Sequence, residues 1–157
     1  MNHLRYYLNH LRYIQGYIEN DIYKMEDRYL NDEETYKRLM IEYEKYGSLF
    51  VAFDFDNTVF DYHKTGDTFP KLEELLIQCR RFNMKLILFT ANEGEKLLEI
   101  IKYCKERGYE PDYVNESPMF PTRKPYYNIL LDDRAGLKSS YDALSKLLFQ
   151  IENMQSH

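Results

Sequence analysis

The segment from Ser48 to Thr58, with the sequence SLFVAFDFDNT, constrains the fold of this chain most strongly. Its first half is a continuous apolar run without alternation, which is typical of a strand buried on both faces of a parallel sheet. Asp54 and Asp56 follow at the point where such a strand should end. Because ligands bind beyond the carboxyl ends of the strands in open parallel sheets, we expect the functional site here.

A turn after this strand would let Asp54 and Asp56 surround one small volume. Asn57 favours such a turn, since asparagine tolerates left-handed backbone geometry better than most residues. Carboxylates that share a small volume repel one another, and a hard cation such as Mg²⁺ relieves that repulsion. The alternative interpretation of these residues alone is a strand followed by an acidic surface turn.

The chain after this segment alternates between helical and strand patterns. Strands are predicted at residues 85–90, 113–114 and 127–131, and helices at residues 70–82, 93–107 and 137–150. This alternation predicts an α/β domain with a parallel, Rossmann-like sheet over residues 48–152.

Residues 1–47 are expected to form an α-helical hairpin ahead of this domain. Apolar residues at alternating steps of four and three define one stripe from Leu4 to Tyr29, and Asn31 is placed to cap a second helix that Gly47 ends. The hairpin is rich in tyrosine, whose rings can pack against the domain or a second subunit, or stack on bases. A homodimer through these helices is therefore one expectation.

The composition is that of an ordinary globular protein, with 44% hydrophobic and 30% charged residues. The net charge of −5 argues against a broad nucleic-acid surface, although it leaves a local basic groove open. No apolar run has the length of a membrane span or the form of a signal peptide. Because Cys79 and Cys104 lack a metal-like spacing, we expect reduced thiols in a cytoplasmic protein without a membrane partner.

Four motifs in the order DFDNT, LFTAN, RKP and LLDDR resemble those of the haloacid dehalogenase superfamily of phosphohydrolases and phosphotransferases. The resemblance covers Ser48 to about Gln150 and extends to small phage-type and bacterial members. It implies a three-layer sheet domain and a phosphorylated substrate. Residues 1–47, ahead of Ser48, lie outside it.

Carried onto this sequence, the resemblance implies that Asp54 is the nucleophile that forms an aspartyl-phosphate. Asp56 would protonate the leaving oxygen and then activate water. Thr90, Lys124 and the backbone amide of Ala91 would hold the transferring phosphoryl group.

The same resemblance implies a Mg²⁺ site formed by Asp54, Asp56 and Asp132, with Asp133 bound directly or through water. Thr58 is expected to brace the loop. The histidine of the following polar loop, His63, is a candidate substrate contact, although a lone loop histidine is more often solvated.

The sequence departs from the family pattern in two respects. Many members have glycine where Asn57 stands, and the segments 59–84 and 92–123 are too short to hold the cap domain that many metabolite phosphatases insert. A capless member resembles relatives that dephosphorylate macromolecular ends, which favours a nucleotide or a nucleic-acid terminal phosphate as substrate. The alternatives are a small phosphorylated metabolite, phosphoryl transfer to an acceptor other than water, and a non-catalytic scaffold whose hairpin mediates dimerisation or binds a partner.

Overall fold

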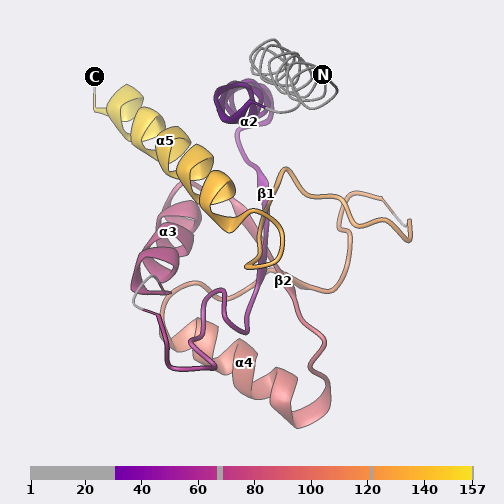
Figure 1. Ribbon diagram of the computed structural model, residues 1–157. Coiled ribbons are helices and arrows are strands. Elements are labelled where there is room, and N and C mark those ends of the chain that lie inside the picture. Colours follow the sequence, from indigo (N-terminus) through magenta and orange to yellow (C-terminus); the bar gives the residue numbers. More distant parts are fainter. Residues whose placement is uncertain (1–30, 67–68, 121, 157) are drawn as a thin grey trace, which may run out of the picture. The chain divides into compact units, whose positions relative to one another are not determined.

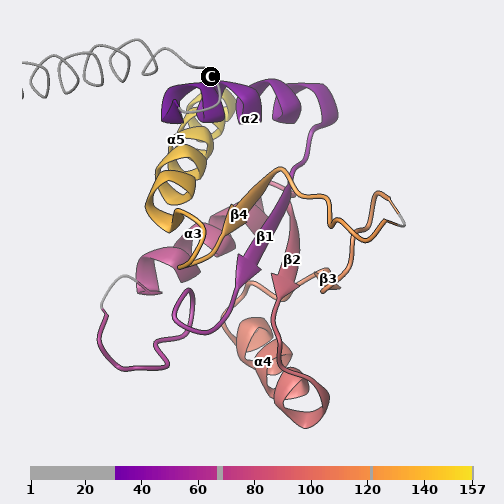
Figure 2. The same cartoon turned by 45° about the vertical axis from the view of Figure 1, so that its right-hand side comes forward.

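The computed structural model of the protein describes residues 31–66, 69–120 and 122–156. In these residues four parallel strands form one sheet in the order β3-β2-β1-β4 (Figure 2). Their bounds are Phe50–Asp54 for β1, Lys85–Phe89 for β2, Tyr113–Val114 for β3 and Ile129–Leu131 for β4. The predicted α/β class with a parallel, Rossmann-like sheet is confirmed, while the finer three-layer arrangement stays a prediction.

The central strand β1 explains why its sequence is apolar without alternation. Val51, Ala52 and Phe53 are fully buried, because β1 lies between β2 and β4 and both of its faces are covered. In the register of the sheet Asp54 pairs with Phe89, and Phe53 pairs with Leu131. The residues that follow these three strands therefore lie at the same edge.

Within the residues that the structure describes, the helices are α2 (Asp32–Tyr46), α3 (Phe69–Arg81), α4 (Gly94–Glu106) and α5 (Leu137–Gln155). α3 and α5 contact each other and lie side by side (Figure 1). The arrowheads of β1 and β2 point toward the end of the domain at which α4 lies (Figure 2). Each helix turns an apolar stripe to the core, and in α5 the buried Ile151 adds a turn beyond the predicted end at Gln150.

The part of α2 from Tyr36 onward belongs to the same compact unit as the sheet. Leu39 is fully buried in the core, and the Arg38 guanidinium donates a hydrogen bond of 3.0 Å to the Asn128 carbonyl. The apolar face of this part of the helix therefore packs on the core, while the predicted division into residues 1–47 and 48–152 stays a prediction. The predicted helix before Asn31, and the homodimer expected through it, lie outside the described residues.

The predicted ends of α2 follow local backbone chemistry. The Asn31 side chain accepts a hydrogen bond of 2.9 Å from the Glu33 amide, and Gly47 adopts a φ of 68° while its amide donates to the Tyr43 carbonyl. Cys79 and Cys104 are free and buried, as expected for reduced thiols. No helix in the described part of the chain has the length and apolarity needed to cross a membrane.

We predict that Leu39→Ala lowers the free energy of unfolding by about 2–5 kcal/mol, because it leaves a cavity where α2 meets the core. The matched control is Ile41→Ala in the same helix, whose side chain is 59% exposed and whose loss should change stability by no more than about 0.5 kcal/mol. Urea denaturation of both variants measures the difference. Equal effects would contradict the packing of α2 on the core.

Candidate functional site

Three of the predicted site residues meet at the carboxyl edge of the sheet. Asp54 is the last residue of β1, Thr90 follows β2, and Asp132 follows β4. The parallel register places the ends of these strands next to one another. The edge predicted from the sequence is therefore the one at which the polar residues gather.

An acidic group occupies this edge. Carboxylate oxygens of Asp54, Asp132 and Asp133 lie within 4.8 Å of one another; the first two residues are partly buried and Asp133 is exposed. Burial raises the pKa of Asp54 above its usual value, and the charges of Asp132 and Asp133 raise it further, against hydrogen bonds from Phe55 and Thr58 that lower it. Three oxygen donors that repel one another fit a hard divalent cation.

The side chain of Thr58 holds this acidic group in place. Its hydroxyl is fully buried, donates a hydrogen bond of 3.2 Å to Oδ2 of Asp54, and accepts one of 3.0 Å from the Asp133 amide. These bonds connect the loop after β1 with the loop after β4. Thr58 therefore braces the site, as predicted.

The turn predicted after β1 is present. Asn57 has a φ of 60°, its amide donates to the Phe60 carbonyl at 2.8 Å, and the Phe60 amide donates back to the Phe55 carbonyl at 2.9 Å. The carboxylate of Asp56, however, lies outside the acidic group, because its Oδ2 accepts a hydrogen bond of 3.1 Å from Nδ2 of Asn92. The Asp56 carboxylate thus faces the end of β2. The predicted role of Asp56 as a metal ligand, which includes its backbone carbonyl, stays a prediction.

A second polar network surrounds Thr90. Its hydroxyl oxygen accepts hydrogen bonds from the Asn92 amide and from Nδ2 of Asn92, at 3.1 Å and 2.9 Å. Its backbone amide donates to Oδ1 of Asn115 at 2.9 Å, and its carbonyl accepts from Nδ2 of Asn115 at 2.7 Å. Asn92 and Asn115 were not among the predicted site residues, although each closely follows a strand.

Lys124, Ala91 and His63 are exposed, and no contact links them to the acidic group within the described residues. Lys124 lies in the loop before β4, where its carbonyl accepts a hydrogen bond from Thr122. The ring of His63 lies edge-on against Tyr62, with 5.3 Å between ring centres. The roles predicted for these three residues stay predictions.

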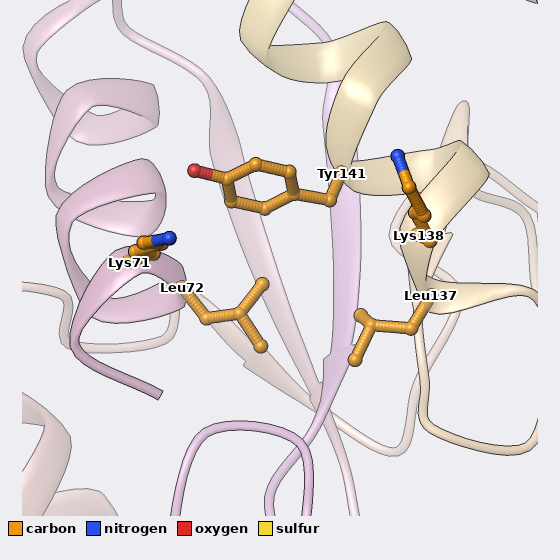
Figure 3. A pocket seen from close by; sticks show the side chains of 5 residues that line it. All are labelled: Lys71, Leu72, Leu137, Lys138 and Tyr141. Atoms are coloured by element: carbon orange, nitrogen blue, oxygen red, sulfur yellow. The ribbon is translucent and has the colours of Figure 1, made fainter. Parts of the chain in front are cut away.

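A cavity of about 360 Å³ between α3 and α5 lies apart from these residues (Figure 3). Leu72 and Leu137 point toward each other beneath the ring of Tyr141, with Lys71 and Lys138 on either side (Figure 3). None of these five lining residues is among those predicted for the site.

Comparisons with known proteins support the fold. No protein-family model matches the chain, and no curated protein matches it. The solved structure of a conserved protein coded by a locus from Bacteroides thetaiotaomicron is similar, with a TM-score of 0.54 and 27% sequence identity. The match covers 66% of this chain and 92% of that chain, and agrees with a Rossmann-like α/β architecture.

We predict that Asp54→Asn stabilises the protein in chelator at pH 7.5 by roughly 1 kcal/mol, or about 2–4 °C in Tm, because it removes one of three repelling charges. Because the pKa of Asp54 is higher in the folded protein, protonation of Asp54 stabilises the fold. This stabilisation is fully present below the usual aspartate pKa and is lost as the pH rises through the raised pKa. The advantage of the variant should therefore shrink toward pH 4.

Thermal unfolding at pH 4 and pH 7.5 measures this difference. Glu152→Gln, which removes an exposed charge on α5 away from the acidic group, is the control and should leave Tm nearly unchanged at both pH values. A lower Tm for Asp54→Asn at pH 7.5 than for the unchanged protein would contradict the repulsion.

Proposed function

We propose that the protein is a Mg²⁺-dependent phosphomonoester hydrolase that acts through an aspartyl-phosphate on Asp54. The observation that carries this proposal is the acidic group of Asp54, Asp132 and Asp133 at the carboxyl edge, next to the network of Asp56 and Thr90. The ordered motifs that resemble the haloacid dehalogenase superfamily add to it. On this proposal residues 48–152 form a capless, three-layer catalytic domain of that type.

The carboxylates of Asp54, Asp132 and Asp133 would hold the metal ion, since they offer three hard oxygen donors close together. When bound, Mg²⁺ offsets the repulsion between an anionic phosphate ester and an attacking carboxylate. Thr58 contributes by fixing Oδ2 of Asp54, which limits the rotation of the nucleophile.

The first proposed step transfers the phosphoryl group to the protein. An oxygen of Asp54 forms a bond to phosphorus while the bond from phosphorus to the leaving oxygen breaks. The electron pair of that bond stays on the leaving oxygen, which takes a proton from the carboxylic acid of Asp56. Because Asn92 donates to Oδ2 of Asp56, the other oxygen is the one that carries this proton.

The second step releases phosphate. Asp56, now a carboxylate, takes a proton from water as the water oxygen attacks phosphorus. The bond between phosphorus and Asp54 breaks, the electron pair returns to the Asp54 carboxylate, and inorganic phosphate leaves. Asp54 and Asp56 return to their starting states, so the cycle is balanced.

The hydroxyl of Thr90 is suited to bind the phosphoryl group. A hydroxyl has one hydrogen and two acceptor positions, and both acceptor positions of Thr90 are taken by hydrogen bonds from Asn92. Its hydrogen is therefore directed away from Asn92 and is available to a phosphoryl oxygen. Lys124 and the Ala91 amide are proposed as further phosphate contacts in the substrate complex.

The central prediction is that the protein releases phosphate from monoesters with Mg²⁺ and not with chelator. Asp54→Asn should lower kcat by at least about 1000-fold while the variant stays folded by circular dichroism, because the asparagine amide cannot replace the carboxylate as nucleophile. A panel of aryl phosphates, nucleotides and phosphorylated oligonucleotides, with phosphate detection, measures this. Absence of release from every compound would contradict the proposal and favour the non-catalytic scaffold.

Thr90→Val should lower kcat/KM by roughly 10-fold to 150-fold, because it removes a hydrogen bond to a charged group. Thr90→Ser keeps the hydroxyl and should recover most of the activity. Thr65→Val, in the exposed loop after β1, is the control. An unchanged kcat/KM for Thr90→Val would show that the Thr90 hydroxyl does not bind the phosphoryl group.

A further inference from the structure

A cavity of about 230 Å³ opens next to the proposed acid–base residue, and its wall is mainly aromatic. Its lining includes Phe55, Asp56, Phe60, Tyr62, Ile100 and Tyr103. Two more, Lys96 and Glu99, pair with each other at 3.3 Å and are well exposed. The cavity therefore has an apolar wall, and the opposite charges of Lys96 and Glu99 at its edge balance each other.

The aromatic wall is held in place by its own contacts. The rings of Phe55 and Phe60 stack at 5.4 Å with only 4° between their planes, and Tyr103 lies edge-on to both, at 5.4 Å and 5.6 Å. The Tyr103 hydroxyl donates a hydrogen bond of 3.2 Å to Glu73, and the Arg107 guanidinium carbon lies 3.5 Å from the centre of its ring. A ligand would thus meet a preformed surface.

The position of this wall relative to the proposed chemistry is fixed by the turn after β1. Asp56 and Phe60 form an isolated parallel bridge, and the Asn57 amide donates to the Phe60 carbonyl at 2.8 Å. The oxygen that Asp56 protonates must lie within hydrogen-bond distance of its carboxyl group. Because Asp56 and Phe60 line the same cavity, this cavity is the space next to Asp56 that can receive the chemical group attached to that oxygen.

Two of the wall residues present aromatic surface to solvent. Tyr62 is 65% exposed and Phe60 is 37% exposed. The Tyr62 ring makes an edge contact with His63 on one side. A flat apolar group placed against Tyr62 and Phe60 would bury this surface next to the reacting atoms.

We propose that the substrate is a phosphate monoester whose leaving group carries a single aromatic ring, bound against Phe60 and Tyr62. This inference rests on the proposed function and narrows its substrate class. An apolar cavity of about 150 Å³ binds benzene, so the space beside Asp56 is large enough for one ring. The internally paired charges of Lys96 and Glu99 favour a neutral ring over an anionic one.

The same geometry disfavours a nucleotide. In a nucleoside phosphate a ribose stands between the phosphate and the base, so its hydroxyl groups would lie against Phe55 and Phe60. Burial of hydroxyl groups against apolar rings without hydrogen-bond partners is costly. A small aryl phosphate and a phosphotyrosine within a peptide share the required chemistry, since each attaches the ring directly to the leaving oxygen.

The test compares benzyl phosphate with propyl phosphate, because both release a primary alcohol and differ mainly in the ring. We expect kcat/KM for benzyl phosphate to exceed that for propyl phosphate by roughly 10-fold, from contacts with two aromatic side chains. Phenyl phosphate, free phosphotyrosine, a phosphotyrosine hexapeptide and adenosine 5′-monophosphate form the other arms. Preference for the hexapeptide over the small aryl esters identifies the peptide source, the reverse preference identifies a small metabolite, and a preference for the nucleotide overturns the inference.

Substitutions in the aromatic wall test whether this wall causes the preference for benzyl phosphate over propyl phosphate. Tyr62→Ala and Phe60→Leu should each lower the ratio of benzyl to propyl kcat/KM by about threefold to tenfold, because each removes aromatic surface from the wall. Phe149→Ala, which removes a ring that is 65% exposed on α5, is the matched control and should leave the ratio unchanged. An unchanged ratio in both wall variants overturns the inference.

A binding measurement separates this inference from the proposed function. The affinities of benzylphosphonate and propylphosphonate, which cannot be hydrolysed, are measured by calorimetry with Mg²⁺. Tighter binding of benzylphosphonate that Tyr62→Ala abolishes, without turnover of any ester, supports the pocket and refutes the hydrolase. Turnover without any aromatic preference supports the hydrolase and refutes the pocket, and absence of both refutes both.

Discussion

Mutual repulsion among three carboxylates at the carboxyl edge of the sheet is the constraint on which the rest of the site depends. The parallel register brings Asp54 and Asp132 to the same edge, and the buried hydroxyl of Thr58 connects Asp54 to the backbone of Asp133. The fold therefore holds partly buried charges together at a cost: burial, and after it the charges of Asp132 and Asp133, raise the pKa of Asp54. A cation bound between these carboxylates would offset their repulsion. The packing that destabilises the fold without a cation therefore also forms the proposed metal site.

The turn after β1 divides this edge into two environments. Asp54, the last residue of β1, faces other carboxylates, whereas Asp56, which directly precedes the left-handed Asn57, accepts a hydrogen bond from Asn92. Two aspartates one residue apart thus have different partners, as a nucleophile and an acid–base group require. The same turn contains Phe60, which stacks on Phe55 in the aromatic wall and forms a bridge with Asp56. One turn therefore positions both the proposed acid–base residue and the wall proposed to bind the leaving group.

The parts of this arrangement that depend on local rules could be predicted from the sequence. Because β1 is buried on both faces, its sequence is a continuous apolar run, which predicts a buried strand. The tolerance of asparagine for left-handed backbone geometry predicted the turn at Asn57. The direction of the Asp56 carboxylate could not be predicted, because it depends on Asn92, which lies across the sheet edge. For Leu39 the sequence predicts a place on the apolar face of a helix, but a helical stripe does not reveal the surface that this face meets.

The most direct test of the account is to identify the residue that carries phosphate during turnover. Asp56→Asn should slow the attack of water and let the phosphorylated protein accumulate, so an acid-quenched reaction with phenyl phosphate and Mg²⁺ can be digested and sequenced by mass spectrometry. The account predicts a phosphoryl adduct on Asp54 that is absent when Asp54→Asn is added. An adduct on another residue such as His63, or turnover with no adduct on the chain, would contradict it.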